Sequence, residues 1–200
     1  MCADILATLP ARRGHFLLES GYHTDLWLTL DELFCAPAAV TPLIETLADR
    51  LRPHAAAAVC GPLLGGAFVA QAVASTLGTR FCYTEPVAAP QGERLFAAEY
   101  RLPPALERWV RAQPVAVVDD VISAGSSVRA TIAALAAAGA SRVVVGTLLV
   151  LGDAALTHFA EQSVPVEALQ RRCFELWKSE ECPLCRSGQP LEDPRVPVGR

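Results

Sequence analysis

The chain has 200 residues, of which 52% are hydrophobic and 19% are charged. This length suits one domain with its own core, and the apolar fraction excludes a disordered chain. Lys and Arg total 17 against 21 Asp and Glu, a net charge of -4, so we expect no broad cationic face and no nucleic-acid partner. A small acidic ligand would have to be bound by a local arrangement of residues.

The sequence also predicts where the protein resides. Residues 55–79 carry no charge and are long enough to span a membrane, but their glycines, proline and glutamine favour a strand, a turn and a helix. The first residues lack the basic-then-apolar layout of a signal peptide. The seven cysteines are odd in number and scattered, which indicates reduced thiols inside a cell. We therefore expect a cytoplasmic protein that does not contact membranes.

The first 53 residues predict a short N-terminal region followed by one clear helix. A helix over 2–13, an extended segment over 16–30 interrupted at Ser20 and Gly21, and a helix over 36–52 that stops at Pro53 are expected in this order.

From residue 56 the chain repeats an apolar strand, a glycine-bearing turn and a helix. The predicted strands are 56–60, 80–84, 115–119, 142–151 and 164–168, with helices ending near Gly78, Gly139 and Gln162. Strands that alternate with helices at this spacing predict an α/β fold with a doubly wound parallel sheet and right-handed crossovers. The proline-bearing stretch 85–113 predicts a long loop that acts as a lid.

The segment 115–127 carries the most specific chemistry. An apolar strand delivers Asp119 and Asp120 to its C-terminal end, where open α/β sheets bind ligands. A turn follows in which backbone N–H groups, hydroxyls and a helix start can meet one phosphate; it comprises Ser123, Ala124, Gly125, Ser126 and Ser127. Carboxylates would repel that phosphate, so they are expected to face sugar hydroxyls or Mg²⁺. This predicts a sugar-phosphate site, and the alternative is a helix-capping cluster after a buried strand.

This run resembles the ribose-phosphate signature of the type I phosphoribosyltransferases. Two further motifs, Phe16-Leu-Leu-Glu-Ser-Gly21 and Cys60-Gly-Pro-Leu-Leu-Gly-Gly66, look like the base loop and the pyrophosphate turn of the orotate phosphoribosyltransferase branch. The resemblance implies transfer of ribose 5-phosphate from phosphoribosyl pyrophosphate (PRPP) to a nitrogenous base, with Mg²⁺, in a homodimer. It assigns Asp119 and Asp120 to the ribose hydroxyls, 123–127 to the 5′-phosphate, and the pyrophosphate to Gly61, Pro62, Leu63, Leu64, Gly65 and Gly66.

The family fold implies one domain over 1–200. We expect its core at about 36–168, a small hood from 1–35 and 169–190 over the base, and a loose tail over 191–200.

The chain departs from the orotate branch at its lysines. Glu19 and Gly65 stand where that branch has lysines, and its mobile-loop cations align with Glu85, Pro86, Ala89 and Gln91. The cations that remain in this segment are Arg94 and Arg101, followed by Arg108 and Arg111. A guanidinium binds phosphate in a bidentate way, so Arg94 and Arg101 are expected to act in catalysis; the alternative is that they are solvated charges.

The expected base pocket comprises Glu19, Ser20, Gly21 and Trp27. A carboxylate at Glu19 would disfavour anionic orotate and suits a base with N–H donors, such as a purine or an aminopyrimidine. Trp27 either stacks on the base or belongs to the core, and neighbouring His23 is expected at the surface. Because the loop lysines are missing, a second hypothesis is a non-catalytic PRPP or nucleotide sensor, and a third is a hydrolase or phosphorylase.

Cys182-Pro-Leu-Cys185 has the spacing of a zinc knuckle but supplies only two ligands. Cys173 could be a third, with the fourth among Cys2, Cys35, His15 and His158. The alternatives for this pair are a redox couple or reduced structural thiols.

Overall fold

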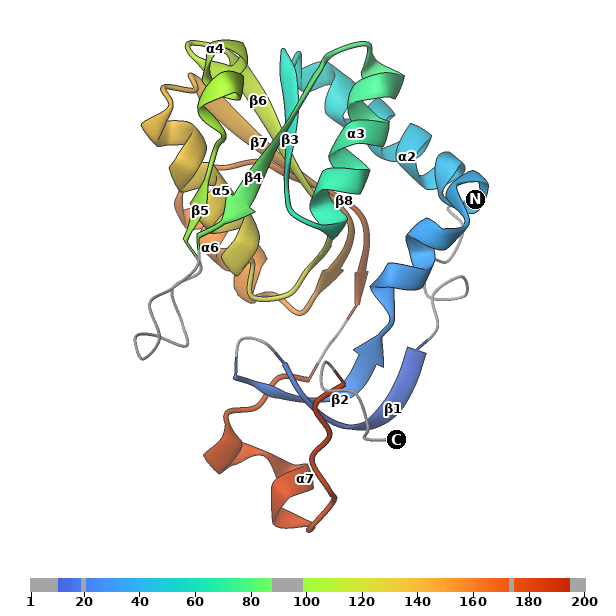
Figure 1. The fold of residues 1–200 in the computed structure, drawn as a ribbon. Coiled ribbons are helices and arrows are strands. Elements are labelled where there is room, and N and C mark those ends of the chain that lie inside the picture. The colour runs from blue at the N-terminus through green and yellow to red at the C-terminus, as the bar shows by residue number, and fades with distance from the viewer. Residues whose placement is uncertain (1–10, 19–20, 88–98, 173–174, 195–200) are drawn as a thin grey trace.

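The computed structural model describes residues 11–18, 21–87, 99–172 and 175–194. Their centre is a six-stranded sheet of order β5-β4-β3-β6-β7-β8, in which all neighbouring strands are parallel except the short edge strand β5. The strands are β3 (Ala58–Pro62), β4 (Arg80–Pro86), β5 (Tyr100–Arg101), β6 (Pro114–Ile122), β7 (Arg142–Leu151) and β8 (Val166–Arg172). The carboxyl ends of the parallel strands point toward a smaller hood (Figure 1).

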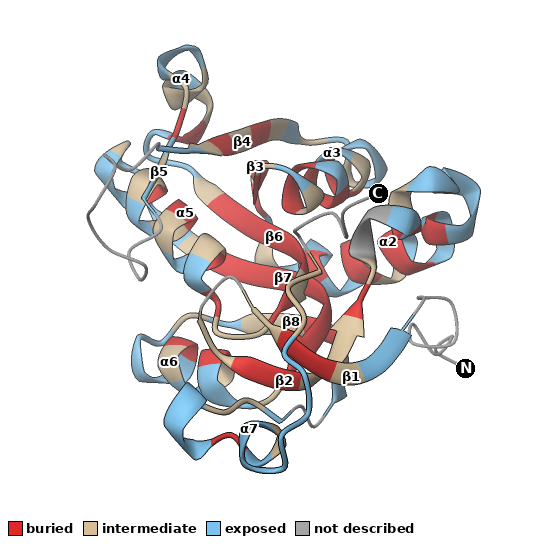
Figure 2. Ribbon diagram, turned by 60° about the horizontal axis from the view of Figure 1, so that its bottom comes forward, coloured by how far each residue is buried: buried red, intermediate tan, exposed pale blue. Residues whose placement is uncertain are grey.

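Helices cover both faces of the sheet, as a doubly wound fold requires (Figure 1). They are α2 (Pro37–Leu51), α3 (Gly65–Leu77), α4 (Glu107–Val110), α5 (Ser126–Ala137) and α6 (Ala154–Glu161), with short 3-10 helices at Leu30–Cys35, Arg52–His54 and Pro104–Leu106. Alternate residues of β6 serve the two layers: Ala116 and Val118 pack with α2 and α3, while Val115 and Val117 pack with α5 and α6. The central strands are therefore almost continuously buried (Figure 2).

The hood is built from both ends of the described chain. The antiparallel hairpin of β1 (Ala11–Leu17) and β2 (His23–Leu28) pairs through His23 with Trp177 and through Phe16 with Glu192. The C-terminal segment also contains a 3-10 helix at Ser179–Glu181 and the short helix α7 (Pro183–Arg186). The hood rests on the sheet because Leu28 of β2 packs against Leu149 and Leu151, at the end of β7.

Three sequence predictions differ from the structure. The helix expected over 2–13 is wrong for 11–13, which begin β1, while its earlier part lies outside the described residues. The loop expected over 85–113 contains β5 and α4 after residue 99. The tail expected to be loose from 191 is held as far as Glu192, whose backbone N–H donates to His15 O at 2.8 Å and whose backbone carbonyl accepts from Leu17 N at 2.9 Å.

In the part of the chain that the structure describes, no helix combines the length and the apolar character needed to cross a bilayer. The uncharged stretch 55–79 forms β3 and α3, as the glycine and proline positions predict.

Candidate functional site: an acid pair between two turns

Strand β6 carries the acid pair to the sheet edge that faces the hood. Asp119 and Asp120 are buried, and the strand continues past them to Ile122. Asp119 Oδ2 accepts a hydrogen bond from the Ser127 hydroxyl at 2.9 Å, and its Oδ1 accepts from the Asp120 backbone N–H at 3.1 Å. Asp120 Oδ1 accepts from the Val121 backbone N–H at 2.7 Å. The pair is thus held in place by its own strand and by the start of α5.

Burial is the largest cause of a strong upward displacement of the Asp119 pKa, and the charge of Asp120 raises this pKa further. The hydrogen bond from Ser127 and that from the Asp120 backbone act in the opposite direction. Hydroxyl donors or a cation would stabilise the ionised form of two neighbouring buried carboxyl groups. That the acids face sugar hydroxyls or Mg²⁺ stays a prediction.

The turn 123–127 leads directly from the acids into α5. Gly125 precedes the first residue of α5 with φ of +76°, in the left-handed region where a side chain is strained. The residues Ser123, Ala124 and Ser126 complete the turn. Ser127 donates its hydroxyl to Asp119, so the expected phosphate turn and the acid pair form one hydrogen-bonded unit.

The glycine turn 61–66 lies against the same acids, although more than fifty residues separate the two motifs. A Cβ atom on Gly65 would stand 2.3 Å from Asp120 Oδ2, and one on Gly66 would stand 2.7 Å from Asp119 Oδ1. Leu63 donates its N–H to Thr84 O at 2.9 Å, which fixes the turn to β4. Gly61 and Pro62 belong to the end of β3, and Leu64, in the middle of the turn, is exposed. The structure thus brings together the two turns that the sequence analysis assigned to the two phosphate groups.

The expected base pocket is only partly described. Glu19 and Ser20 lie outside the described residues, and Gly21 closes the turn before β2 by donating its N–H to Leu18 O at 2.9 Å. The Trp27 ring lies 6.3 Å from the Phe16 ring, so it has a packing partner inside the hood. Leu26, its neighbour on β2, and Val121, directly after the acid pair, both pack against the cluster of Leu28, Leu149 and Leu151, which places the hairpin near the site.

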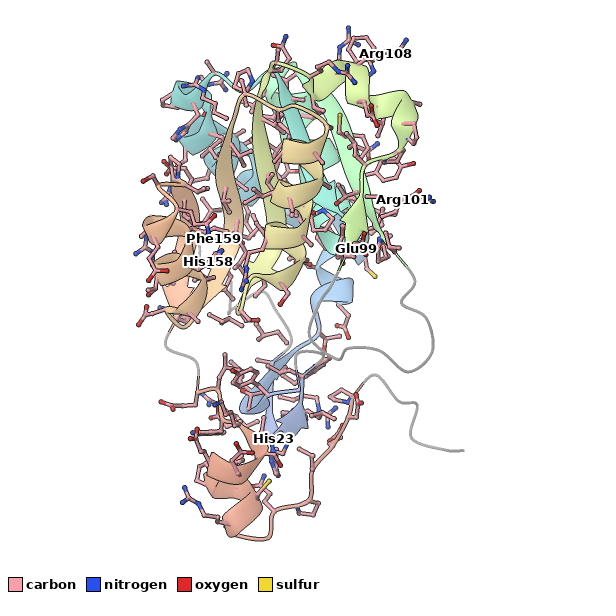
Figure 3. The ribbon with its side chains drawn as sticks, turned by 90° about the vertical axis from the view of Figure 1, so that its left-hand side faces the viewer. His23, Glu99, Arg101, Arg108, His158 and Phe159 are labelled. Carbon is pink, nitrogen blue, oxygen red and sulfur yellow. The ribbon has the colours of Figure 1, made fainter. Side chains whose placement is uncertain are left out.

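The arginines of the segment 85–113 occupy different ends of the sheet. Arg94 lies outside the described residues. Arg101 donates from Nε and Nη2 to Glu85 Oε2, at 3.2 and 3.1 Å, between β5 and β4. Arg108 lies over Trp109 on α4, and Arg111 pairs with Glu107 there. Figure 3 shows Arg101 nearer the hood and Arg108 at the opposite end of the molecule, so α4 is separated from the acid pair.

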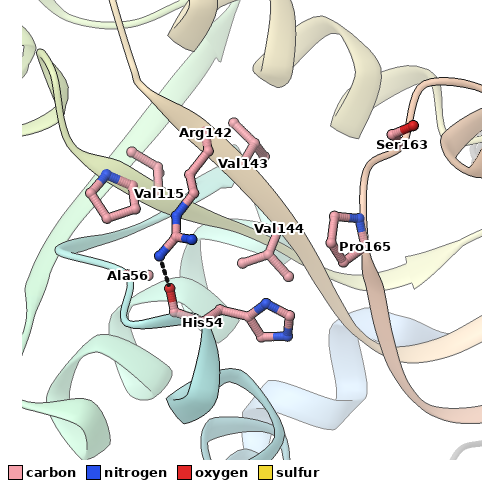
Figure 4. A pocket seen from close by; sticks show the side chains of 9 residues that line it. His54, Ala56, Val115, Arg142, Val143, Val144, Ser163 and Pro165 are labelled. Carbon is pink, nitrogen blue, oxygen red and sulfur yellow. Dashed lines mark hydrogen bonds between the residues drawn. The ribbon is translucent and has the colours of Figure 1, made fainter.

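A pocket of about 220 Å³ opens at the other end of the sheet, between the first residues of β6, β7 and β8. Val115, Val144 and Pro165 form its apolar wall, and Arg142 donates to the His54 backbone carbonyl at 2.8 Å across its mouth (Figure 4). None of the described candidate site residues lines this pocket, so it plays no part in the candidate site.

The residues that meet Cys182 and Cys185 in the structure differ in part from the predicted zinc ligands. Cys173 and Cys2 lie outside the described residues, Cys35 is exposed at the end of a 3-10 helix, and the His158 ring lies against Phe159 on α6. Cys182 and Cys185 instead meet His15 and His23 in the hood. The expectation that His23 is a surface residue is wrong, because His23 is buried in the hood, where its backbone also pairs with Trp177. No spacing rule in the sequence joins these four residues, since they come together only through the hood.

An open parallel sheet with helices on both faces and polar turns at its carboxyl edge is the architecture of α/β proteins that bind ligands at that edge. Residues 31–177 match the phosphoribosyl transferase domain family. The orotate phosphoribosyltransferase of Thermotoga maritima is 31% identical over 198 residues, 97% of each chain. That of Caldanaerobacter subterraneus is 30% identical over 185 residues, 91% of this chain and 88% of the relative. The chain belongs to the type I phosphoribosyltransferase family, is similar to its orotate branch, and is a pentosyltransferase.

Solved structures agree on the fold. The orotate phosphoribosyltransferase from Aeropyrum pernix superposes with a TM-score of 0.65 at 22% identity, covering 86% of this chain and 93% of that one. The APRTase from Giardia lamblia complexed with 9-deazaadenine gives a TM-score of 0.67 at 16% identity, covering 86% and 97%. The shared fold therefore extends across enzymes named for different bases.

Proposed function

We propose that this phosphoribosyltransferase transfers ribose 5-phosphate from PRPP to orotate and releases pyrophosphate. The observation that carries the proposal is the meeting of three motifs at one sheet edge: the acid pair, the turn 123–127 and the glycine turn 61–66. The orotate phosphoribosyltransferases that are 30–31% identical over nearly the whole chain support orotate as the acceptor.

The turn 123–127 would bind the 5′-phosphate with backbone N–H groups and hydroxyls at the start of α5. The carboxylates of Asp119 and Asp120 would accept hydrogen bonds from the ribose hydroxyls, which orients C1 between the base and the departing pyrophosphate. The glycine turn would hold that pyrophosphate with backbone groups, because its glycines carry no side chain between their backbone and the acids. In this arrangement, positioning and charge stabilisation account for catalysis.

The acid pair also fits Mg²⁺, the cation that the family uses with PRPP. Carboxylate oxygens are its preferred protein ligands, and Asp119 and Asp120 present a buried pair of them beside the pyrophosphate turn. When bound, Mg²⁺ would offset the negative charge of the pyrophosphate. We further propose that Asp119 and Asp120 hold the ribose and the cation together, in a homodimer as the family resemblance implies.

Pyrophosphate release from PRPP, measured against orotate, uracil, adenine and guanine, tests the proposal. Release that depends on orotate is the expected result. Release with a purine instead would favour the base with N–H donors that Glu19 suits, and would refute orotate as the acceptor. If no base gives pyrophosphate release while calorimetry shows that PRPP binds, the result would favour the non-catalytic sensor.

Arg101 provides a separate test of the catalytic loop. The side chains of Arg101 and Arg111 are each 69% exposed and each paired with a glutamate, but of these two only Arg101 is on the strand pair that borders residues 88–98. We expect Arg101→Ala to lower kcat/KM for PRPP about 10-fold, since a hydrogen bond to a charged group contributes about 1.5 kcal/mol or more. The matched variant Arg111→Ala should leave it unchanged. Equal kcat/KM values for the wild type and Arg101→Ala would show that Arg101 takes no part in turnover and only pairs with Glu85.

A further inference from the structure

Four potential metal ligands from the two ends of the described chain converge in the hood. His15 Nε2 and His23 Nδ1 are 3.0 Å apart, and Cys182 Sγ lies 3.4 Å from His15 Nε2. Cys185 Sγ lies 3.3 Å from His23 Nδ1 and 3.7 Å from His15 Nε2. All four donor atoms lie within 4.8 Å of one another, and His15, His23 and Cys182 are buried. Figure 3 shows His23 well separated from the sheet, so this cluster is distinct from the acid pair.

These separations are close to those of a tetrahedron around one ion. Zinc binds imidazole nitrogen at about 2.0–2.1 Å and thiolate sulfur at about 2.3 Å, so the ligand atoms of a tetrahedral site stand about 3.3–3.8 Å apart. The four distances above run from 3.0 to 3.7 Å. A small outward movement of the two histidine rings would complete the site.

Hydrogen bonding alone does not account for the arrangement. His15 Nδ1 lies 2.8 Å from the Gln189 backbone carbonyl, which can only accept, so Nδ1 carries the proton and Nε2 presents a lone pair. That single lone pair is approached by His23 Nδ1 and by both sulfur atoms, and it can accept one hydrogen bond in its plane. A backbone carbonyl that fixes the tautomer is also the usual outer partner of a metal-bound histidine.

In the described residues, the two chain segments of the hood are joined by backbone hydrogen bonds at Trp177 and Glu192 and by the Arg12–Glu192 ion pair. The hood packs against the sheet through a small apolar cluster around Leu28, Leu149 and Leu151, and small units commonly need a metal or a disulfide for stability. The two backbone pairings, through Trp177 and Glu192, flank the four ligand residues. A bound ion at this point would fix the C-terminal segment to the hairpin.

We propose that His15, His23, Cys182 and Cys185 bind one zinc ion and that this ion is structural. Two thiolates and two neutral imidazoles in tetrahedral geometry select zinc among the common divalent cations. Four protein ligands leave no open position for a substrate, which separates this role from catalysis. Binding requires loss of the two thiol protons, so zinc uptake releases protons and strengthens as the pH rises.

The first experiment measures zinc in the full-length protein, purified under reducing conditions and dialysed after zinc addition. We expect one zinc per chain. Replacement of that zinc by Co²⁺ should give the strong visible absorption of tetrahedral cobalt together with a thiolate charge-transfer band. A wild-type protein without bound zinc, or one that forms a Cys182–Cys185 disulfide in the presence of zinc, would overturn the proposal.

A pair of cysteine variants localises the ion. Cys185→Ser alters the cluster at its exposed rim, and we expect zinc affinity to fall at least about 100-fold. Cys35→Ser, at another exposed cysteine, should retain one zinc per chain. If Cys185→Ser does not fold, chelation of the wild type replaces it: the Tm should fall on zinc removal and recover on zinc addition. Undiminished zinc in Cys185→Ser, or a wild-type Tm that does not change on zinc removal, would contradict the assignment.

Discussion

The Asp119→Asn, Asp120→Asn double variant is expected to lose PRPP binding by a factor of at least about 100. A hydrogen bond to a charged group contributes about 1.5–3 kcal/mol, so two weakened bonds correspond to about 3 kcal/mol or more. The amide side chains keep the size of the carboxyl groups but not their charge, so the loss reports on electrostatics and not on packing. Calorimetric titration with PRPP and Mg²⁺ measures it.

The double variant is expected to remain folded, and the effect of Asp119→Asn alone on stability can be predicted from the pKa of Asp119. Because the pKa of Asp119 is raised in the folded state, this group contributes stability at pH values below its ordinary pKa of 3.8 and loses that contribution as the pH rises through the raised value. Once the group is ionised, its charge therefore opposes folding. We expect Asp119→Asn, without ligand, to unfold at the same temperature as the wild type or higher, with a difference that grows as the pH rises above 3.8 and through the raised pKa of Asp119.

Asp49→Asn, on the exposed surface of α2, serves as the control for both measurements. It should bind PRPP as the wild type does and should show no comparable growth of stability with pH. If the double variant binds PRPP normally, the acid pair is not the ribose site and the proposed function loses its main support. If the double variant unfolds, Asp119 is chiefly a structural anchor for Ser127.

Gly65→Ala is expected to reduce kcat/KM at least about 100-fold while the protein remains folded. Its Cβ would stand 2.3 Å from Asp120 Oδ2, so the carboxylate must move away from the position at which it would meet the ribose. The displaced atom is the end of a side chain, which can rotate, so the damage should be confined to the site. A misplacement of about 1 Å at a catalytic centre can reduce the rate about 100-fold.

Gly61→Ala distinguishes a packing defect from this effect. Its Cβ would stand 2.1 Å from the Gly66 backbone carbonyl, which cannot move without disturbing the start of α3. We expect a loss of about 1–3 kcal/mol in the free energy of unfolding, as for other overpacked positions. Chemical denaturation of both variants, with Gln71→Ala on the exposed side of α3 as the control, separates the two cases. Full activity in Gly65→Ala would show that the two turns do not share a ligand.

The parallel sheet could be predicted because its main strands can be recognised from short stretches of consecutive residues. Strand β7 is an almost wholly apolar run followed by Gly152, and the predicted strand 142–151 agrees with it to the residue. The acid pair and its turn were equally readable because Asp119, Gly125 and Ser127 lie within nine consecutive residues.

The remaining features depend on contacts between distant residues. Nothing near Gly65 in the sequence shows that Asp120 fills the space where a side chain would stand. Edge strand β5 is two residues long, below the length at which alternation can be recognised. The burial of His23 could not be predicted from its sequence neighbours, because its backbone pairs with Trp177 and its ring contacts Cys185, more than 150 residues later.

The arrangement of the hood also sets the order in which this protein can be completed during synthesis. The strands β3 to β8 lie between residues 58 and 172, so the sheet can close once they have left the ribosome. The hairpin, although made before the sheet, lacks its pairing partners until Trp177 and Glu192 appear. These outer edges of β1 and β2 therefore stay unpaired until the sheet residues have been made, which exposes the hairpin to pairing with the wrong strand.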